Sequence, residues 1–134
     1  MPNGNLTETD GFGKEVVDYR TYLMEMSKAK IALCPSGIET PDSFRLYEAL
    51  EAGCLPVVDA YSTNNPTRGY WQYLFGKDVP FPIISEWSML PKLMPQLLKE
   101  YPENVNKVFA WWQTYKRNLK TKLENVYNEK FKIL

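Results

Sequence analysis

Two short apolar runs on either side of one helix constrain the fold of this chain more than any other feature. Residues 29–34 form the first run, between Lys28 and Pro35, and residues 55–58 form the second. Runs of this length, bounded by charged residues, proline or glycine, are typical of buried strands. A strand, a helix and a second strand within about thirty residues form a βαβ unit, which implies parallel strands and a right-handed crossover. The sequence therefore predicts an α/β fold.

The helix between these strands has start and stop signals of its own. Thr40 or Asp42 can cap its N-terminus. Pro41 suits the first turn because the N–H that proline lacks would be unpaired there. Gly53 can adopt the left-handed conformation that ends a helix. The predicted inner face of this helix consists of Leu46, Ala49 and Leu50.

Apolar spacing predicts further helices on both sides of this unit. We expect a helix from Glu15 to the first strand, another over residues 88–101, and a long last helix from Pro102 to about residue 131. Residues 81–84 are a candidate third strand, whereas residues 59–82 contain several breakers and are otherwise expected to be irregular. We expect the aromatic side chains of that irregular segment to pack in the core rather than on a ligand: Tyr61, Tyr70, Trp71, Tyr73, Phe75 and Phe81.

Composition excludes several function classes. Sixteen basic and sixteen acidic side chains give no net charge, so we expect no nucleic-acid partner. The chain has no histidine, which rules out histidine-based triads and histidine metal sites within it, and we expect no metal site. Cys34 and Cys54 lack the spacing of metal ligands, and we expect buried free thiols, although a disulfide is conceivable if their strands are neighbours.

The same reasoning gives expectations for membranes and location. No run approaches the roughly 20 apolar residues that a membrane helix needs, so we expect no membrane span. Residues 1–14 have no basic segment leading into an apolar core, and we therefore expect no signal peptide and a cytoplasmic location. Because this segment is rich in Gly, Asn and Thr, we expect it to be a flexible arm.

A ligand site is expected where the first strand leads into the helix. A glycine loop (Gly37) at the carboxyl end of a parallel strand, followed by a helix N-terminus, is a common phosphate-binding arrangement. Arg45 and Glu48 share a face of that helix. A guanidinium can neutralise a pyrophosphate and a carboxylate can accept hydrogen bonds from a ribose diol, so the pair suits a nucleoside diphosphate. Alternatively, the two residues form only a surface ion pair.

The segment from Cys34 to Val58, CPSG…DSFRLYEALEAGCLPVV, resembles the C-terminal half of exostosin-type glycosyltransferases of the GT-B superfamily. The similarity covers residues 19–60 well and residues 82–100 loosely. It implies a nucleoside diphosphate sugar as donor substrate and no further cofactor. The matching positions are Pro35, Gly37, Ser43, Arg45, Glu48, Ala49, Leu50, Gly53, Cys54, Leu55, Pro56, Val57 and Val58.

The resemblance also implies roles for individual residues. Glu48 matches the acidic residue that contacts the nucleotide ribose, and Arg45 matches the basic residue near the diphosphate. Gly37 and Ser43 match positions where backbone and hydroxyl groups approach the donor. Retaining GT-B enzymes often carry a second glutamate eight residues earlier; Thr40 is at that position here, so Glu39 is the nearest candidate for a sugar contact. The catalytic residues remain unassigned.

GT-B enzymes place the acceptor on a second domain, so the resemblance implies that this chain is incomplete as an enzyme. We expect residues 15–134 to be a partial, Rossmann-like three-layer donor-binding domain, with a short parallel sheet of about three strands and a long C-terminal helix. An acceptor-domain partner chain would complete it. Alternatively, the chain is a non-catalytic nucleotide- or partner-binding module, or a scaffold that associates through its sheet edge. Because the strand over residues 29–34 would have an open edge, we expect a homodimer.

Overall fold

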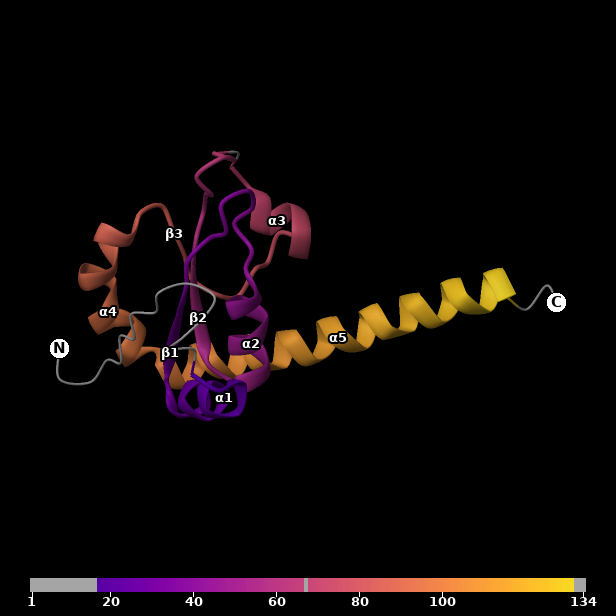
Figure 1. Cartoon of the computed structure of the whole chain (residues 1–134), viewed down its shortest axis with the longest axis horizontal. Coiled ribbons are helices and arrows are strands. Elements are labelled where there is room, and N and C mark those ends of the chain that lie inside the picture. The colour runs from indigo at the N-terminus through magenta and orange to yellow at the C-terminus, as the bar shows by residue number, and fades with distance from the viewer. Residues whose placement is uncertain (1–16, 67, 132–134) are drawn as a thin grey trace.

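A three-stranded parallel sheet forms the centre of the computed structural model, which describes residues 17–66 and 68–131 (Figure 1). The strands β1 (Ile31–Cys34), β2 (Leu55–Asp59) and β3 (Ile83–Ile84) lie in the order β1-β2-β3. Cys34 pairs with Val58, which in turn pairs with Ile83, so the carboxyl ends of the strands meet at one edge of the sheet. This arrangement confirms the predicted parallel sheet. The expected arm over residues 1–14 lies outside the described residues.

Helices surround the sheet and account for most of the remaining chain. Their bounds are α1 (Tyr19–Lys28), α2 (Phe44–Ala52), α3 (Tyr70–Phe75), the short 3-10 helix η1 (Trp87–Met89), α4 (Leu90–Lys99) and α5 (Tyr101–Phe131). The predicted stop of α2 is confirmed, because Gly53 has a left-handed φ of 76°. The predicted start is wrong, since Ser43 is the N-cap residue of α2. The reason is that the Asp42 carboxylate accepts a hydrogen bond from the Tyr70 hydroxyl at 2.7 Å instead of capping the helix.

The expectation of irregular structure over residues 59–82 is wrong at α3. Gly69 and Gly76, with φ of 83° and 92°, flank this short helix rather than preventing it. Trp71 is 1% exposed, and its indole Nε1 donates to the backbone carbonyl of Asp59 at 2.8 Å. A helix this short is not stable alone. The burial of Trp71 against the sheet therefore stabilises α3.

The core lies on both faces of the sheet, which makes three layers. On one face, a large cluster joins residues of the sheet to α1, α2, α3 and α5, and it includes Leu46, Leu50 and Trp71. On the other face, Leu97 of α4 packs with Val57 and Ile84. Figure 1 shows α4 on the opposite side of the strands from α2 and α3.

The aromatic side chains of residues 61–81 enter the core in part, as expected. Trp71 and Phe81 are buried and meet edge to face, with ring centroids 5.6 Å apart. Phe75 packs edge to face against Trp111 of α5 at 5.2 Å. Tyr73, in contrast, is 91% exposed. The aromatic cluster thus fixes α3 between the sheet and α5.

Helix α5 packs on the domain with its first half and projects beyond it with its second (Figure 1). Val108 and Trp112 are buried, and Glu51 of α2 accepts hydrogen bonds from Trp112 Nε1 at 2.9 Å and from Lys116 Nζ at 2.8 Å. Within the described segments, no helix is long and apolar enough to cross a membrane. The apolar stripe continues into the projecting half, where its members are exposed: Leu119, Leu123, Val126, Tyr127 and Phe131.

Candidate functional site

One carboxylate, that of Asp59, joins the carboxyl ends of all three strands. Its Oδ2 atom accepts hydrogen bonds from Ser36 Oγ, which follows β1, at 2.9 Å and from Trp87 Nε1, which follows β3, at 3.2 Å. In open α/β sheets, ligands bind beyond the carboxyl ends of the strands. Sequence reasoning missed Asp59, although an acidic residue directly after a buried apolar run was a usable signal.

Arg45 and Glu48 lie on α2, which begins after the loop that follows β1. They are not an ion pair: within residues 17–66 and 68–131, the salt bridges join lysines to glutamates. Instead, Glu48 Oε2 accepts a hydrogen bond from the Tyr22 hydroxyl of α1 at 3.0 Å. Burial raises the pKa of Tyr22, and the nearby positive charge of Arg45 opposes that rise. Glu48 is therefore paired with Tyr22 of α1 rather than with Arg45, which the surface ion-pair alternative does not predict.

The loop before α2 is fixed at several points. A Cβ atom on Gly37 would lie 3.2 Å from the Thr40 carbonyl oxygen and 3.4 Å from that of Asp42, so close packing inside the loop favours glycine. The exposed Glu39 side chain accepts a hydrogen bond from Asn64 Nδ2 at 2.6 Å. The Asn64 backbone N–H also donates to the carbonyl of Ile38 at 3.0 Å. Glu39 is thus paired with the turn after β2 rather than with Arg45 or Glu48.

Asp42 ties this loop to α3. Its Oδ1 atom accepts from the Tyr70 hydroxyl at 2.7 Å, and its Oδ2 atom accepts from the Tyr47 hydroxyl at 3.5 Å. Burial acts to raise the pKa of Asp42, but hydrogen bonds from Thr40, Tyr70 and Tyr47 outweigh it and lower the pKa below the usual value. Asp42 is therefore ionised at neutral pH and holds the loop in its folded position.

Two buried oxygen atoms near this edge have no hydrogen-bond partner. They are Ser43 Oγ, at the N-cap of α2, and Asp59 Oδ1. Among the described residues, these are the buried side-chain oxygen or nitrogen atoms without a partner. An unsatisfied buried polar group costs about 1–3 kcal/mol, so each needs an explanation. Both atoms belong to the region where the sequence predicts the ligand.

The pKa of the Cys34 thiol is affected by burial and by the charged groups of the same region. Burial raises its pKa to about 12, and Arg45, Glu48 and Asp59 add smaller electrostatic contributions. Cys34 and Cys54 are both free and buried, which confirms the expectation for the cysteines. Among the residues with a described structure, no group of three or more acidic or cysteine side chains could hold a metal ion.

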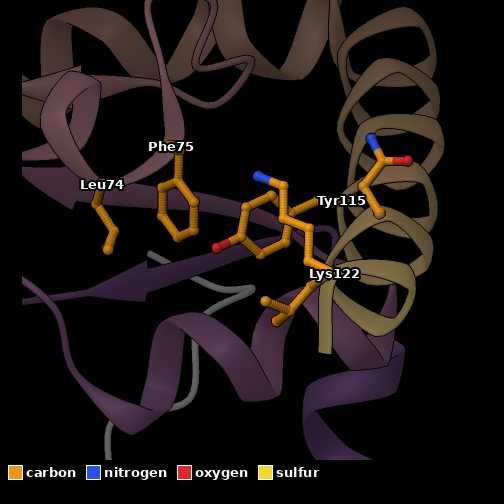
Figure 2. A pocket seen from close by; sticks show the side chains of 6 residues that line it. Leu74, Phe75, Tyr115 and Lys122 are labelled. Atoms are coloured by element: carbon orange, nitrogen blue, oxygen red, sulfur yellow. The ribbon is translucent and has the colours of Figure 1, made fainter. Parts of the chain in front are cut away.

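Two surface hollows lie elsewhere, along α5. Figure 2 shows the side chains that line a groove of about 340 Å³ between α3 and α5, among them Phe75, Tyr115 and Lys122. The other, of about 350 Å³, is lined by residues 123, 124, 127 and 128. Neither contains a residue predicted to bind the donor. The predicted site is therefore defined by its polar groups rather than by either of these hollows.

Comparison with known proteins links the chain to one family. Residues 13–132 match the profile of the RXYLT1 C-terminal domain. The chain is similar to ribitol-5-phosphate xylosyltransferase 1 of Homo sapiens, with 28% identity over 123 residues that cover 84% of this chain and 28% of the relative. The protein of the same name from Danio rerio is 26% identical over 120 residues, covering 84% and 27%. The chain thus spans about a quarter of the length of these relatives. No solved structure matches it.

Proposed function

Because the chain belongs to the RXYLT1 C-terminal domain family, we propose that it is the donor-binding part of a GT-B glycosyltransferase of exostosin-like type. In this proposal it binds a nucleoside diphosphate sugar, and a separate domain or partner chain supplies the acceptor site. The names of the relatives suggest a xylosyl group as the sugar and ribitol 5-phosphate as the acceptor. The comparisons support a glycosyltransferase relationship, and the finer roles rest on the geometry of the site.

The observation that carries the proposal is the position of Arg45 and Glu48 in the first turns of α2, beside the carboxyl ends of the strands. Glu48 is oriented by the Tyr22 hydroxyl at 3.0 Å, so its carboxylate is held in place for a ribose diol. Arg45 is exposed at the helix N-terminus, where the positive end of the helix dipole also favours a diphosphate. In this arrangement, Gly37 and Ser43 approach the donor from the loop.

These groups suit the chemistry of sugar transfer. The bond between the anomeric carbon and the β-phosphate oxygen breaks, a bond from that carbon to the oxygen of an acceptor hydroxyl forms, and that hydroxyl releases its proton. The departing nucleoside diphosphate gains negative charge, which Arg45 and the N-terminus of α2 would stabilise. Glu39 remains the proposed sugar contact and must leave Asn64 to reach the ligand, since the two are hydrogen-bonded at 2.6 Å.

Nucleotide binding tests the proposal directly. We expect the chain to bind UDP, GDP or UDP-xylose with a dissociation constant in the high micromolar range, about −5 kcal/mol, by calorimetry or ligand-observed NMR. Glu48→Gln should weaken binding by about 1–3 kcal/mol, because a hydrogen bond to a charged acceptor is lost. Glu51→Gln is the matched control, since Glu51 lies on the same helix but faces α5. Absence of binding at millimolar nucleotide would contradict the proposal.

A second candidate function, a partner-binding module, is favoured by the projecting half of α5. Five apolar residues there are between 44% and 63% exposed, which is unusual for a stripe of this length: Leu119, Leu123, Val126, Tyr127 and Phe131. If the chain is a partner-binding module, it binds another protein through this face. Glu48→Gln should then leave nucleotide binding unchanged. The binding measurements above therefore separate the two functions.

A further inference from the structure

The two carboxylate oxygens of Asp59 have very different surroundings. An ionised carboxylate offers about four acceptor positions. Oδ2 accepts hydrogen bonds from Ser36 Oγ and Trp87 Nε1, whereas Oδ1 is buried and has no partner. The residue as a whole is only 9% exposed, so water does not readily satisfy it. Oδ2 is therefore held in place by two hydrogen bonds from the protein, whereas Oδ1 can still accept hydrogen bonds from a ligand.

Asp59 also lacks a compensating cation. In the described part of the chain, no lysine or arginine forms a salt bridge with it. A buried carboxylate without a counter-ion is costly. Its backbone carbonyl and its Oδ2 already secure Trp71, Ser36 and Trp87. An asparagine could make those contacts without the charge, so folding alone does not explain the acid.

The charge of Asp59 selects the group that it can bind. A carboxylate repels phosphate, so the diphosphate belongs with Arg45 and the α2 N-terminus rather than with Asp59. Neutral hydroxyl donors fit, because each gives a charge-assisted hydrogen bond to the free oxygen. We propose, on the basis of the proposed function, that Asp59 is a specificity-determining residue that binds hydroxyl groups of the donor sugar through Oδ1.

The ligand must gain access to this atom. The segment of residues 36–43 begins with Ser36, which contacts Asp59, and ends with Ser43, whose hydroxyl is also buried and unpaired. Binding requires that this segment shifts outward as the ligand enters, so that Asp59 Oδ1 and Ser43 Oγ become accessible. Bound sugar hydroxyls then supply the missing partners. The segment is held by the contacts of Asn64 with Ile38 and Glu39 and by the hydrogen bond from Tyr70 to Asp42.

Asp59→Asn tests the inference in the full chain, with UDP and UDP-xylose as paired ligands. We expect wild type to bind UDP-xylose more tightly than UDP. In the variant, UDP-xylose binding should weaken about tenfold or more, while UDP binding stays within twofold. The melting temperature should be unchanged or higher, because asparagine keeps an acceptor for Ser36 and Trp87 and removes a buried charge. Asp78→Asn, an exposed aspartate, is the matched control and should change neither affinity.

Each other outcome is decisive. Equal weakening of UDP and UDP-xylose, or no change in either, would overturn the sugar-binding role of Asp59 while leaving the proposed function intact. Failure of wild type to bind either ligand would remove the proposed function and this inference together. If Asp59→Asn does not fold, Ser36→Ala replaces it, because it leaves the carboxylate in place but removes one orienting donor. That variant should lose several-fold affinity for UDP-xylose alone, and unchanged affinity would refute the inference.

Discussion

Replacing Trp71 by phenylalanine should destabilise the fold by about 2–5 kcal/mol. The indole Nε1 donates to the Asp59 carbonyl at 2.8 Å, and loss of a buried hydrogen bond costs about 1–3 kcal/mol. The smaller ring also leaves a cavity beside Phe75 and Phe81, with centroids at 6.1 Å and 5.6 Å from Trp71. Since truncation of a buried aromatic to alanine costs about 3–5 kcal/mol, this partial truncation should add about 1–2 kcal/mol.

Urea unfolding followed by far-ultraviolet circular dichroism measures this loss without relying on tryptophan fluorescence. The expected change corresponds to a fall of roughly 10 °C in melting temperature for a domain of this size. Tyr73→Phe is the matched control, because Tyr73 lies on the same helix but is 91% exposed, and its replacement should change stability by less than about 0.5 kcal/mol. A change below about 1 kcal/mol for Trp71→Phe would refute the conclusion that this side chain holds α3 to the sheet.

Three further predictions concern pH, thiol reactivity and assembly. The pKa of Asp42 is lower in the folded state, so this carboxylate stabilises the fold above its unfolded pKa, and that stabilisation is lost as pH falls below about 4. Asp42→Asn should therefore lower the free energy of unfolding by about 1 kcal/mol at neutral pH. It should also reduce the loss of stability at acid pH in a plot of unfolding free energy against pH. With a pKa raised to about 12, Cys34 should resist thiol reagents until the protein is unfolded, and rapid labelling of native protein would contradict its burial. The β1 edge should support a dimer in light scattering at tens of micromolar, and Leu33→Lys, at a residue 41% exposed on that strand, should disrupt it; a wild-type monomer would contradict this.

The sequence alone was sufficient for the central βαβ unit. The apolar runs at residues 29–34 and 55–58 became β1 and β2 because short buried strands need little beyond local hydrophobicity and flanking breakers. Gly53 ended α2 as expected, since a left-handed residue at a helix end is a local requirement. Arg45 and Glu48 were placed on one face of α2 by helical period alone. These features depend on neighbours only a few residues apart in the chain.

The tertiary structure decided the features that depend on distant partners. α3 exists because Trp71 is buried and donates a hydrogen bond to Asp59 of β2, a contact outside the helix that the local breakers could not reveal. The start of α2 at Ser43 follows from the engagement of Asp42 by Tyr70, 28 residues later. Tyr22 of α1 donates a hydrogen bond to Glu48 of α2. Ser36 and Trp87 both donate hydrogen bonds to Asp59 because the three parallel strands end at the same edge of the sheet. Sequence period fixes which residues share an element, whereas only the packing of elements determines which side chains meet across them.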